Sequence, residues 1–593
     1  MSKPSPVLAE PLGARTRPSS SARSPWYQTA LTELYSPRGL WWITGLAFLL
    51  AAGSFGVGLS TDDHVARANA QQGFVNPLTA FGFRPQPGLD RSSGYLAWWS
   101  SPELSVKFLR PLSVLTHADF ILWPNAVWAM HGINILLYTV LAGLAWWLYR
   151  TLIPGAAIAA LATLLFTVDE GHAQAVGWIS SRNTVLCAVF GLAAIGLHVR
   201  ARQRGKTETW KSASCFALAL LAGEGGSATF AYLIAYEVAF ETGALRERVS
   251  RLWAHLSVSV LWLMLYLGGH YGVHGSSFYR ELSDPLSVIG NGLADLPLWI
   301  AGLLGPSLIG STLVLPPVST RLIAAAVCLP VCIVIARTVP PTRENRFFAL
   351  GALLCLPPLF TTVTQDRLLI MASFGAFGVL SSFIFAAAQA ARRMLRVLGW
   401  SMLAIHGGLA ALLFMPMLSG GTGPIELGSR ALVAALPKEA TEQVVLVNVP
   451  LELLPMYARY IVREQSDRTP PELLQQLYAG ASELTLTRVD DSTLEVHAKQ
   501  GWGAFPIERI FGNIRDMPRK DEVLQLERMQ LRVLASTSDG RPERVQFRFP
   551  SSLESSDRLL YVWQGKAPAL WRPPPVGQSE VLPAMTLFDA LPQ

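Results

Sequence analysis

The chain has 593 residues, of which 51% are hydrophobic and only 15% are charged, and its mean hydropathy is +0.34. Because the apolar residues form long blocks, this composition indicates a polytopic α-helical membrane protein and excludes an ordinary soluble enzyme. The net charge of +7 does not indicate a nucleic-acid partner, because the arginines stand in short segments beside the apolar blocks. The five cysteines lie in apolar blocks without metal-ligand spacing, so neither a disulfide framework nor a zinc site is predicted.

The N-terminal unit, residues 1–38, is rich in Ser, Pro and Arg. It is too polar to bury a core, so we predict a disordered, basic segment in the cytoplasm. The apolar run at 40–59 then crosses the membrane outward, and the long leader before it disfavours the alternative of a cleaved signal peptide. The transmembrane domain is predicted to cover 39–418 and to include a polar extracytoplasmic loop at 61–125.

Ten further apolar runs are predicted to cross the membrane, which gives about eleven spans. The apolar stretch 287–305 is expected to lie in or re-enter the outer interface, because only then do all the basic segments fall on the cytoplasmic side. The paired tryptophans, Trp98 and Trp99 among them, are expected to anchor span ends at the headgroup layer. The ten runs are 126–149, 153–168, 184–199, 211–222, 227–240, 252–268, 320–336, 347–361, 368–389 and 397–416, and the basic segments are 200–204, 246–248, 343–346 and 392–393.

The composition of residues 419–593 is that of a soluble domain, with charged residues interleaved among short β-rich runs. The order of these elements predicts a small α/β or α+β domain, which lies outside the cell membrane if the count of spans is right. No catalytic spacing is visible in it. Strands are predicted at 444–449, 484–489, 494–498, 531–534, 545–549 and 559–563, and helices at 451–463 and 471–480.

Polar residues gather at the predicted outer ends of the spans. An ionisable group at membrane depth costs several kcal/mol unless it faces a polar partner or cavity, so such groups are candidates for function. Asp62 and Asp63 stand just where the first span ends and, taken alone, could be ordinary solvated loop acids. Other polar residues near the outer ends of spans favour a single site on one membrane face. These residues are Arg110, His117, His131, Asn134, Asp169, Glu170, His172, Arg182, Glu224, Asp366 and Arg367.

Several of these residues stand in segments that resemble a known superfamily. The segments read Phe-Leu-Arg-Pro-Leu at 108–112, His-Gly-Ile-Asn-Ile-Leu-Leu at 131–137 and His-Ala-Gln-Ala-Val-Gly-Trp-Ile-Ser-Ser-Arg at 172–182. In order and spacing they are similar to motifs of the GT-C superfamily of polyprenyl-phosphate-sugar-dependent glycosyltransferases, and within it to the TMTC-type protein O-mannosyltransferases. Glu224 stands where that family has Lys-Glu, and 366–375 resembles its last motif, so the likeness covers about 40–416.

The chain departs from the family pattern at several positions. Asp169 and Glu170 replace a His-Pro pair, Gln174 replaces a glutamate, and Gly223 replaces the lysine before Glu224. The tail shows no tetratricopeptide-like helical repeat, which that branch carries. These departures leave the identity of the sugar and of the acceptor open.

The resemblance implies a GT-C-like fold of about eleven transmembrane helices and an inverting transfer of a sugar, with a mannose-like hexose favoured. It implies a base at Asp62 or Asp63 and a donor phosphate held by Arg110, Arg182 and His172. It implies no obligatory cofactor and leaves a divalent metal open. Substrate-binding or supporting roles fall to His131, Asn134, Asp169, Glu170, Glu224, Asp366 and Arg367.

Structural roles remain open for some of these residues. His131 and Asn134 recur on one helical face and could form a helix–helix hydrogen bond, Glu224 could stand in a simple loop, and Asp366 could pair with Arg367. Two other function classes also remain, a non-catalytic membrane assembly or sensor protein and a lipid-linked oligosaccharide transporter or flippase. The expected partners are a polyprenyl-phosphate-linked sugar, a protein or glycan acceptor and the lipid bilayer. The expected location is a bacterial inner membrane, with the tail in the periplasm.

Overall fold

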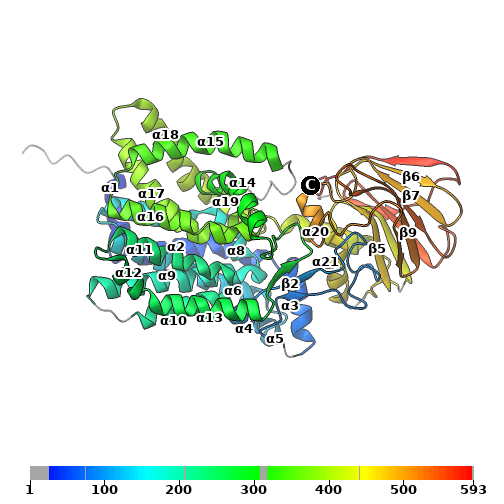
Figure 1. Cartoon of the computed structure of the whole chain (residues 1–593), viewed down its shortest axis with the longest axis horizontal. Coiled ribbons are helices and arrows are strands. Elements are labelled where there is room, and N and C mark those ends of the chain that lie inside the picture. The colour runs from blue at the N-terminus through cyan, green and yellow to red at the C-terminus, as the bar shows by residue number, and fades with distance from the viewer. Residues whose placement is uncertain are drawn as a thin grey trace, which may run out of the picture.

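The computed structural model describes residues 26–73, 75–205, 209–306, 315, 317–439, 441–465 and 467–589. It divides into an α-helical bundle and a β-rich domain, which follow one another along the longest axis of the molecule (Figure 1). We call the end of the bundle that faces the β-rich domain the domain end, and the opposite end the basic end. This arrangement confirms a polytopic helical membrane protein with a C-terminal soluble domain.

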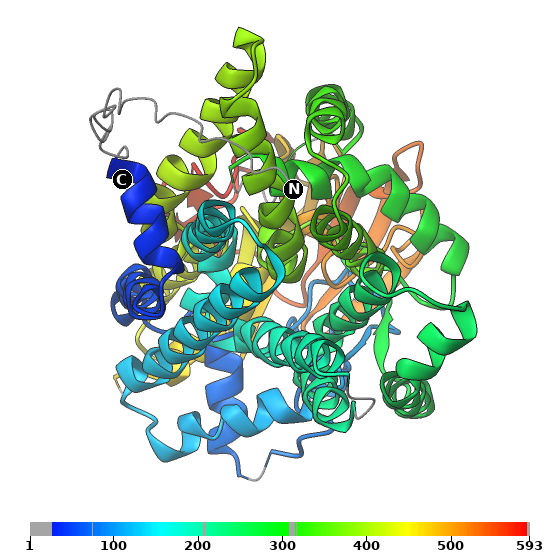
Figure 2. The ribbon, with the colours of Figure 1, turned by 90° about the vertical axis from the view of Figure 1, so that its left-hand side faces the viewer.

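Eight helices of the described residues are long and apolar enough to cross a membrane, and a bent pair, α12 (Leu245–Arg251) and α13 (Trp253–Gly268), brings the number to nine. Figure 2 looks along the bundle from its basic end and shows these helices packed around one another, with the β-rich domain behind. The eight are Gly39–Gly56, Val127–Leu152, Ala156–Gly177, Ile179–Gln203, Pro285–Leu304, Pro317–Thr338, Asp366–Ala388 and Arg393–Met417. They contain helices α2 (Gly39–Ala51), α6 (Val127–Leu152), α7 (Ala156–Val168), α9 (Arg182–Gln203), α14 (Pro285–Leu304), α15 (Pro317–Thr338), α17 (Ile370–Ala388), α18 (Arg393–Leu403) and α19 (Ala410–Met417).

The expected eleven spans differ from the helices in two respects. Three of them are short helices of 13, 12 and 12 residues, namely α10 (Trp210–Ala222), α11 (Ala228–Ala239) and α16 (Arg343–Leu354). The stretch 287–305 is instead a helix of spanning length, α14. Asp295, halfway along α14, accepts a hydrogen bond from Arg321 near the start of α15 (2.7 Å), so the middle of α14 lies level with the domain end of α15. This height along the bundle is the one expected if α14 is a re-entrant helix. The position of α14 in the membrane remains a prediction.

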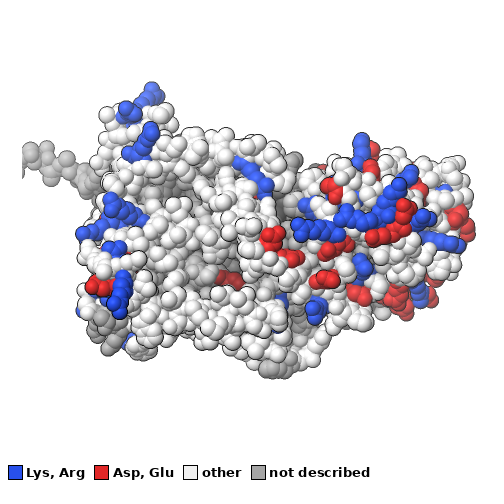
Figure 3. All heavy atoms as spheres, in the orientation of Figure 1, with Lys and Arg blue, Asp and Glu red and all other residues white. Residues whose placement is uncertain are grey.

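Charge is distributed along the axis as a membrane protein requires. Lys and Arg gather at the basic end, where α1 (Trp26–Tyr35), α12 and α18 lie, and the middle of the bundle carries few charges (Figure 3). The predicted disorder of 1–38 is wrong for α1, because Leu31 and Leu34 pack against the core and the carbonyl of Leu34 accepts a hydrogen bond from the Trp146 indole (2.9 Å). Residues 1–25 lie outside the described residues.

The polar loop at 61–125 does not stand free but joins the bundle to the β-rich domain. It forms α3 (Asp62–Gln71), β1 (Gly82–Phe83), β2 (Ser105–Lys107), α4 (Pro111–Thr116) and α5 (Asp119–Leu122), and β2 also pairs with β3 (Gly272–His274). The expected role of Trp98 and Trp99 as membrane anchors is wrong. Both are buried in the core of the β-rich domain, where Trp98 donates to the carbonyl of Leu477 (2.9 Å) and Trp99 to the carboxylate of Glu452 (3.1 Å).

The β-rich domain contains two sheets. The smaller has the order β12-β11-β4-β5, with β11, β4 and β5 parallel, and the larger is antiparallel with the order β13-β6-β7-β10-β9-β8. Helix α20 (Gly423–Ala435) leads from the bundle into these sheets, and α21 (Leu453–Arg463) connects the parallel strands β4 and β5 and packs against α20 and α3. The strands are β4 (Gln443–Val449), β5 (Leu473–Ala479), β6 (Leu484–Arg488), β7 (Thr493–Ala498), β8 (Val523–Leu526), β9 (Met529–Ser536), β10 (Pro542–Arg548), β11 (Arg558–Gln564), β12 (Ala567–Leu570) and β13 (Ser579–Leu582).

The six predicted strands are all confirmed, and so is the helix at 451–463. The helix predicted at 471–480 is wrong, because this segment forms β5. Every residue of β5 is buried, so its sequence lacks the alternation of apolar and polar residues that marks a half-exposed strand. Its apolar residues at 473, 474, 477 and 478 have helical spacing by coincidence.

The structure predicts that the loop and the β-rich domain lie on the same side of the membrane. Gln72→Cys and Lys566→Cys, both at exposed positions, should react together with a membrane-impermeant maleimide in intact cells, and Arg204→Cys should react only after permeabilisation. The unmodified chain, whose cysteines are all buried or half-buried, serves as the background. Labelling of Gln72→Cys and Arg204→Cys from the same side would contradict this arrangement.

Candidate functional site

Two cavities meet at the domain end of the bundle. The bundle cavity, of about 320 Å³, lies between α9, α13 and residues 358–372. The loop cavity, of about 420 Å³, lies between α3, β1, α4, α5 and the β-rich domain. Five residues line both cavities and therefore mark their junction: Phe108, Arg110, Asn183, Tyr279 and Arg367. A third and larger hollow, the interdomain cleft of about 1230 Å³, is also lined by Tyr279.

Asp62 lines the loop cavity and faces it from the first turn of α3. One of its carboxylate oxygens, Oδ1, accepts a hydrogen bond from the hydroxyl of Tyr457 in α21 (2.6 Å). The confined position raises the pKa of Asp62 by burial, and the Tyr457 hydrogen bond and the positive charges of Arg367 and Arg110 partly offset this effect. The result is a carboxylate that is open to a cavity and more basic than a free aspartate.

Asp63 is buried and points away from both cavities. Its Oδ1 accepts from the backbone N–H and the hydroxyl of Ser180 (both 2.7 Å), and its Oδ2 accepts from the backbone N–H of Ser60 (3.1 Å). Burial raises its pKa to about 7 against the lowering effect of these donors. With three donors already bound, Asp63 holds the start of α3 to the turn before α9 and has no free oxygen directed at a substrate.

Arg110 stands at the junction, held by the carboxylate of Glu224. Its Nε donates to Glu224 Oε2 (2.7 Å), while the backbone N–H of Leu109 donates to Oε1 (3.2 Å), and the guanidinium lies over the ring of Phe108 (4.2 Å). Among the described residues no acceptor lies at either Nη of Arg110, so two of its nitrogens remain for an anion. Glu224 is therefore neither a simple loop residue nor a free acid, because it orients this arginine.

Arg367 reaches the junction from the start of the helix that precedes α17. Its Nε donates to Gln365 (2.8 Å) and one Nη donates to Ser181 (2.9 Å), while the guanidinium lies over the Trp178 ring (4.7 Å). The other Nη has no acceptor among the described residues. The partners of Arg367 at these nitrogens are thus the neutral side chains of Gln365 and Ser181.

The expected phosphate-binding role of Arg182 is not supported by the structure. Its side chain is fully buried, and the guanidinium donates to four acceptors within the fold. They are Asn134 Oδ1 (2.6 Å), the carbonyl of Thr116 (2.6 Å), the Asp119 carboxylate (2.7 Å) and the carbonyl of Met130 (3.1 Å). Arg182 therefore ties the loop at 116–119 to α6, and it lines neither cavity.

The histidines His172 and His131 are also buried away from both cavities. His172 is hydrogen-bonded to Ser373 (2.9 Å), lies 3.1 Å from the Asp169 carboxylate and packs against the Phe166 ring, and His131 contacts the carbonyl of Gly58 (3.0 Å). The predicted role of His172 in phosphate binding is thus not supported by this geometry. Asn134, Asp169, Glu170 and Asp366 likewise line neither cavity, and Asn134 donates to the Val176 carbonyl (3.0 Å) as a helix-packing residue does.

Two tyrosines of the site, Tyr279 and Tyr457, are not predicted from the sequence. Tyr279 follows β3 and stacks edge-on against Phe108 (5.5 Å between ring centroids). Tyr457 belongs to the β-rich domain, in which we expected no catalytic residue. With Leu453, Met456, Ile510 and Phe511, it supplies a wall of the loop cavity. Their only signal in the sequence is an aromatic residue in a polar segment, which is too common to identify a site.

No metal centre is formed by the residues that the structure describes, since none of their His, Cys, Asp and Glu side chains form a group of three placed to hold an ion.

The chain has little similarity to known proteins. No family model and no curated protein matches the chain. Among solved structures, a crystal structure of ArnT from Cupriavidus metallidurans in the apo state is similar over 60% of this chain and 75% of that chain, at 13% identity and a TM-score of 0.32. The geometry of the site therefore carries the functional argument.

The contrast between the two aspartates predicts that the same substitution destabilises the protein at one position and not at the other. Asp63→Asn places an amide N–H₂ against backbone or hydroxyl donors and should lower the free energy of unfolding by about 1–3 kcal/mol. Asp62→Asn keeps the side-chain oxygen that accepts from Tyr457 and should leave stability nearly unchanged. Thermal unfolding of the two purified variants measures the difference, and an equal loss of stability in both would contradict these placements.

Proposed function

We propose that this protein is a membrane glycosyltransferase that transfers a sugar from a polyprenyl-phosphate donor to a hydroxyl acceptor with inversion at the anomeric carbon. One observation carries the proposal. At the junction of two cavities, an accessible carboxylate of raised pKa, Asp62, lies within electrostatic reach of two arginines that keep free guanidinium nitrogens, Arg110 and Arg367. Attack by a hydroxyl requires a base, and departure of a lipid phosphate requires cations, so both requirements are met at one place.

In the proposed reaction the acceptor oxygen forms a bond with the anomeric carbon of the sugar while the bond from that carbon to the phosphate oxygen breaks. Asp62 takes the hydroxyl proton as the new bond forms. The leaving phosphate keeps the electron pair of the broken bond, and Arg110 and Arg367 stabilise its charge through paired N–H donors. Attack from the side of Asp62, opposite to the phosphate, gives inversion.

The bundle cavity suits the lipid chain of the donor. Its walls include Trp262, Leu263 and Tyr266 of α13 and Met371 of α17, and its inner end reaches Arg110 and Arg367. Leu263 is exposed on the surface of the bundle as well. A chain lying in this cavity would thus run from the apolar surface of the bundle to the two arginines. The sugar itself is assigned by the sequence resemblance alone, which favours a mannose-like hexose.

The proposed mechanism is tested by a substitution that removes the base. Asp62→Asn has nearly the shape of Asp62 but cannot accept a proton at neutral pH, so sugar transfer should fall by about 100- to 10,000-fold while donor binding is kept. Transfer of radiolabelled sugar from a purified polyprenyl-phosphate donor in membranes measures the rate. Transfer at the parental rate in Asp62→Asn would exclude Asp62 as the base, whereas no transfer above background by the parental protein would favour a non-catalytic assembly protein.

The hydrogen bond from Tyr457 makes the pH dependence of this reaction predictable. Asp62 must be ionised to act as a base, so activity is present above its pKa and is lost as the pH falls through it. Tyr457 donates to the ionised form and thereby lowers the pKa. Tyr457→Phe should therefore move the acidic limb of the kcat/KM profile to higher pH.

A matched control exists on the same helix. The hydroxyl of Tyr460 forms a 2.6 Å hydrogen bond with the hydroxyl of Tyr95 and not with Asp62. Tyr460→Phe removes an equivalent tyrosine hydroxyl and should leave the acidic limb in place. A shift of the same size in both variants would show that the effect is structural and not transmitted through Asp62.

A further inference from the structure

The loop cavity, on which Asp62 opens, has apolar walls. Apart from Asp62 and the junction residues, it is lined mainly by aliphatic and aromatic side chains from α3, β1, α4, α5 and the β-rich domain. The remaining polar lining, Asn69, Tyr95, His117, Trp178 and Ser180, offers few hydrogen-bonding groups for a peptide backbone or a glycan, which need many when they are desolvated. The lining includes Val65, Ala66, Val75, Pro77, Phe81, Phe83, Val114, Leu115, Ala118, Ile121, Leu453, Met456 and Phe511.

The mouth of this cavity is apolar as well. Leu115 and Ile121 line the cavity and are nevertheless 62% and 53% exposed, so they stand at its opening. Leu122 and Trp123, which follow on α5, are also exposed. Helices α4 and α5 are short and turn apolar side chains outward at the domain end of a membrane-spanning bundle. This pattern is typical of an element lying in the membrane interface. Such an opening is suited to the entry of a lipid.

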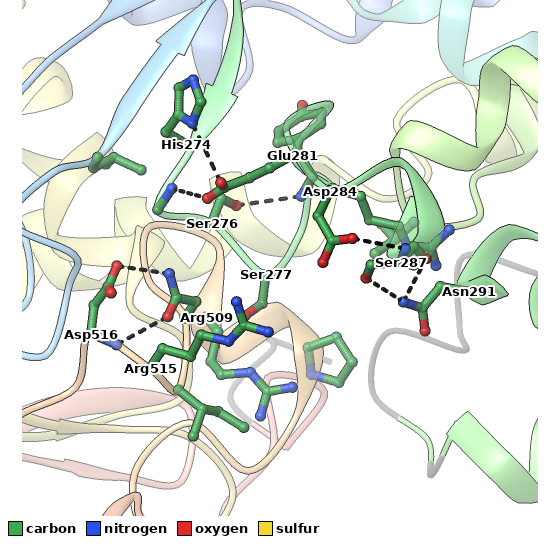
Figure 4. A pocket seen from close by; sticks show the side chains of 18 of the residues that line it. His274, Ser276, Ser277, Glu281, Asp284, Ser287, Asn291, Arg509, Arg515 and Asp516 are labelled. Atoms are coloured by element: carbon green, nitrogen blue, oxygen red, sulfur yellow. Dashed lines mark hydrogen bonds and ion pairs between the residues drawn. The ribbon is translucent and has the colours of Figure 1, made fainter. Parts of the chain in front are cut away.

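The interdomain cleft offers a competing route for a polar acceptor, but three of its carboxylates are already hydrogen-bonded within the fold. Glu281 accepts from the backbone N–H of Gly275 (2.9 Å), Asp284 accepts from that of Ser287 (3.1 Å), and Asp516 accepts from Asn513 (2.7 Å), as Figure 4 shows. Each of these contacts lies within the bundle or within the β-rich domain. Asp62 does not line this cleft, whereas it does line the loop cavity.

We propose that the acceptor is a membrane amphiphile, a lipid with a hydroxyl group in its head, which enters the loop cavity from the bilayer beside α4 and α5. This inference rests on the proposed function, because it takes the side of the junction that holds the base to be the acceptor side. The apolar part of the acceptor lies along the cavity walls, and its hydroxyl reaches Asp62. The donor and the acceptor then approach the junction from two separate apolar cavities.

Binding can be tested without sugar transfer. The purified full chain is placed in phosphatidylcholine vesicles that contain a diacylglycerol with a photoreactive diazirine in one acyl chain, and cross-linked peptides are mapped by mass spectrometry after illumination. We expect labels on the cavity walls, in peptides that cover 62–70, 106–121 and 453–457. Ala118→Trp fills the cavity and should lower this labelling by about tenfold, which corresponds to about 1.4 kcal/mol of binding free energy.

The matched control is Ala254→Trp, at a half-buried alanine of α13 that lines a different surface hollow of the bundle. It should leave the labelling of the loop cavity unchanged. If Ala118→Trp does not fold, Ala66→Trp on the α3 wall provides the same test. Labelling confined to the outer surface of the bundle, or equal in the filled and parental proteins, would overturn the proposal even if Asp62 proves catalytic. Labelling that is kept while the parental protein transfers no sugar would instead refute the proposed function alone.

Discussion

The buried contact between His64 and two glutamates of the C-terminal part of the chain fixes the position of α3. His64 lies 3.1 Å from Glu426 of α20 and 3.0 Å from Glu464, just after α21. Burial alone lowers the pKa of His64, but the hydrogen bonds and charges of the two carboxylates outweigh it and raise the pKa to about 9. The ring is thus charged at neutral pH, and removing one partner of such a buried group costs several kcal/mol. The direction of Asp62 depends on this clamp, because the two residues share the first turn of α3.

The clamp explains why the site is shared between parts of the chain that are far apart in sequence. Asp62 and Tyr457 are separated by 395 positions, yet their side chains are hydrogen-bonded. Arg110 is held by Glu224, and Arg367 is held by Gln365 and Ser181. Each group that faces the junction is therefore oriented by a second group from another element, which is the arrangement that keeps a reaction centre preorganised.

Apolar blocks and β-rich runs were sufficient to predict the class of the protein, most of its long helices and six strands of the tail. The same patterns could not separate exposed from buried polar residues. Arg182 and Arg110 both stand near span ends, but the acceptors of Arg182 include the backbone carbonyls of Thr116 and Met130, which leave no trace in a sequence. Asp62 and Asp63 are adjacent, and only the turn of a helix decides which of them faces the cavity. Tyr457 could not be predicted as a site residue, because a contact between two domains leaves no local pattern in the sequence.

The insertion of Trp98 and Trp99 into the β-rich domain has a consequence for the biogenesis of the protein. These side chains are synthesised some 350 residues before their partners Glu452 and Leu477. Until the last third of the chain has emerged, the early loop exposes two large indole rings and lacks one wall of its cavity. The candidate site is therefore completed only late in synthesis, and a chain that is cut short before α21 lacks the wall that Tyr457 supplies.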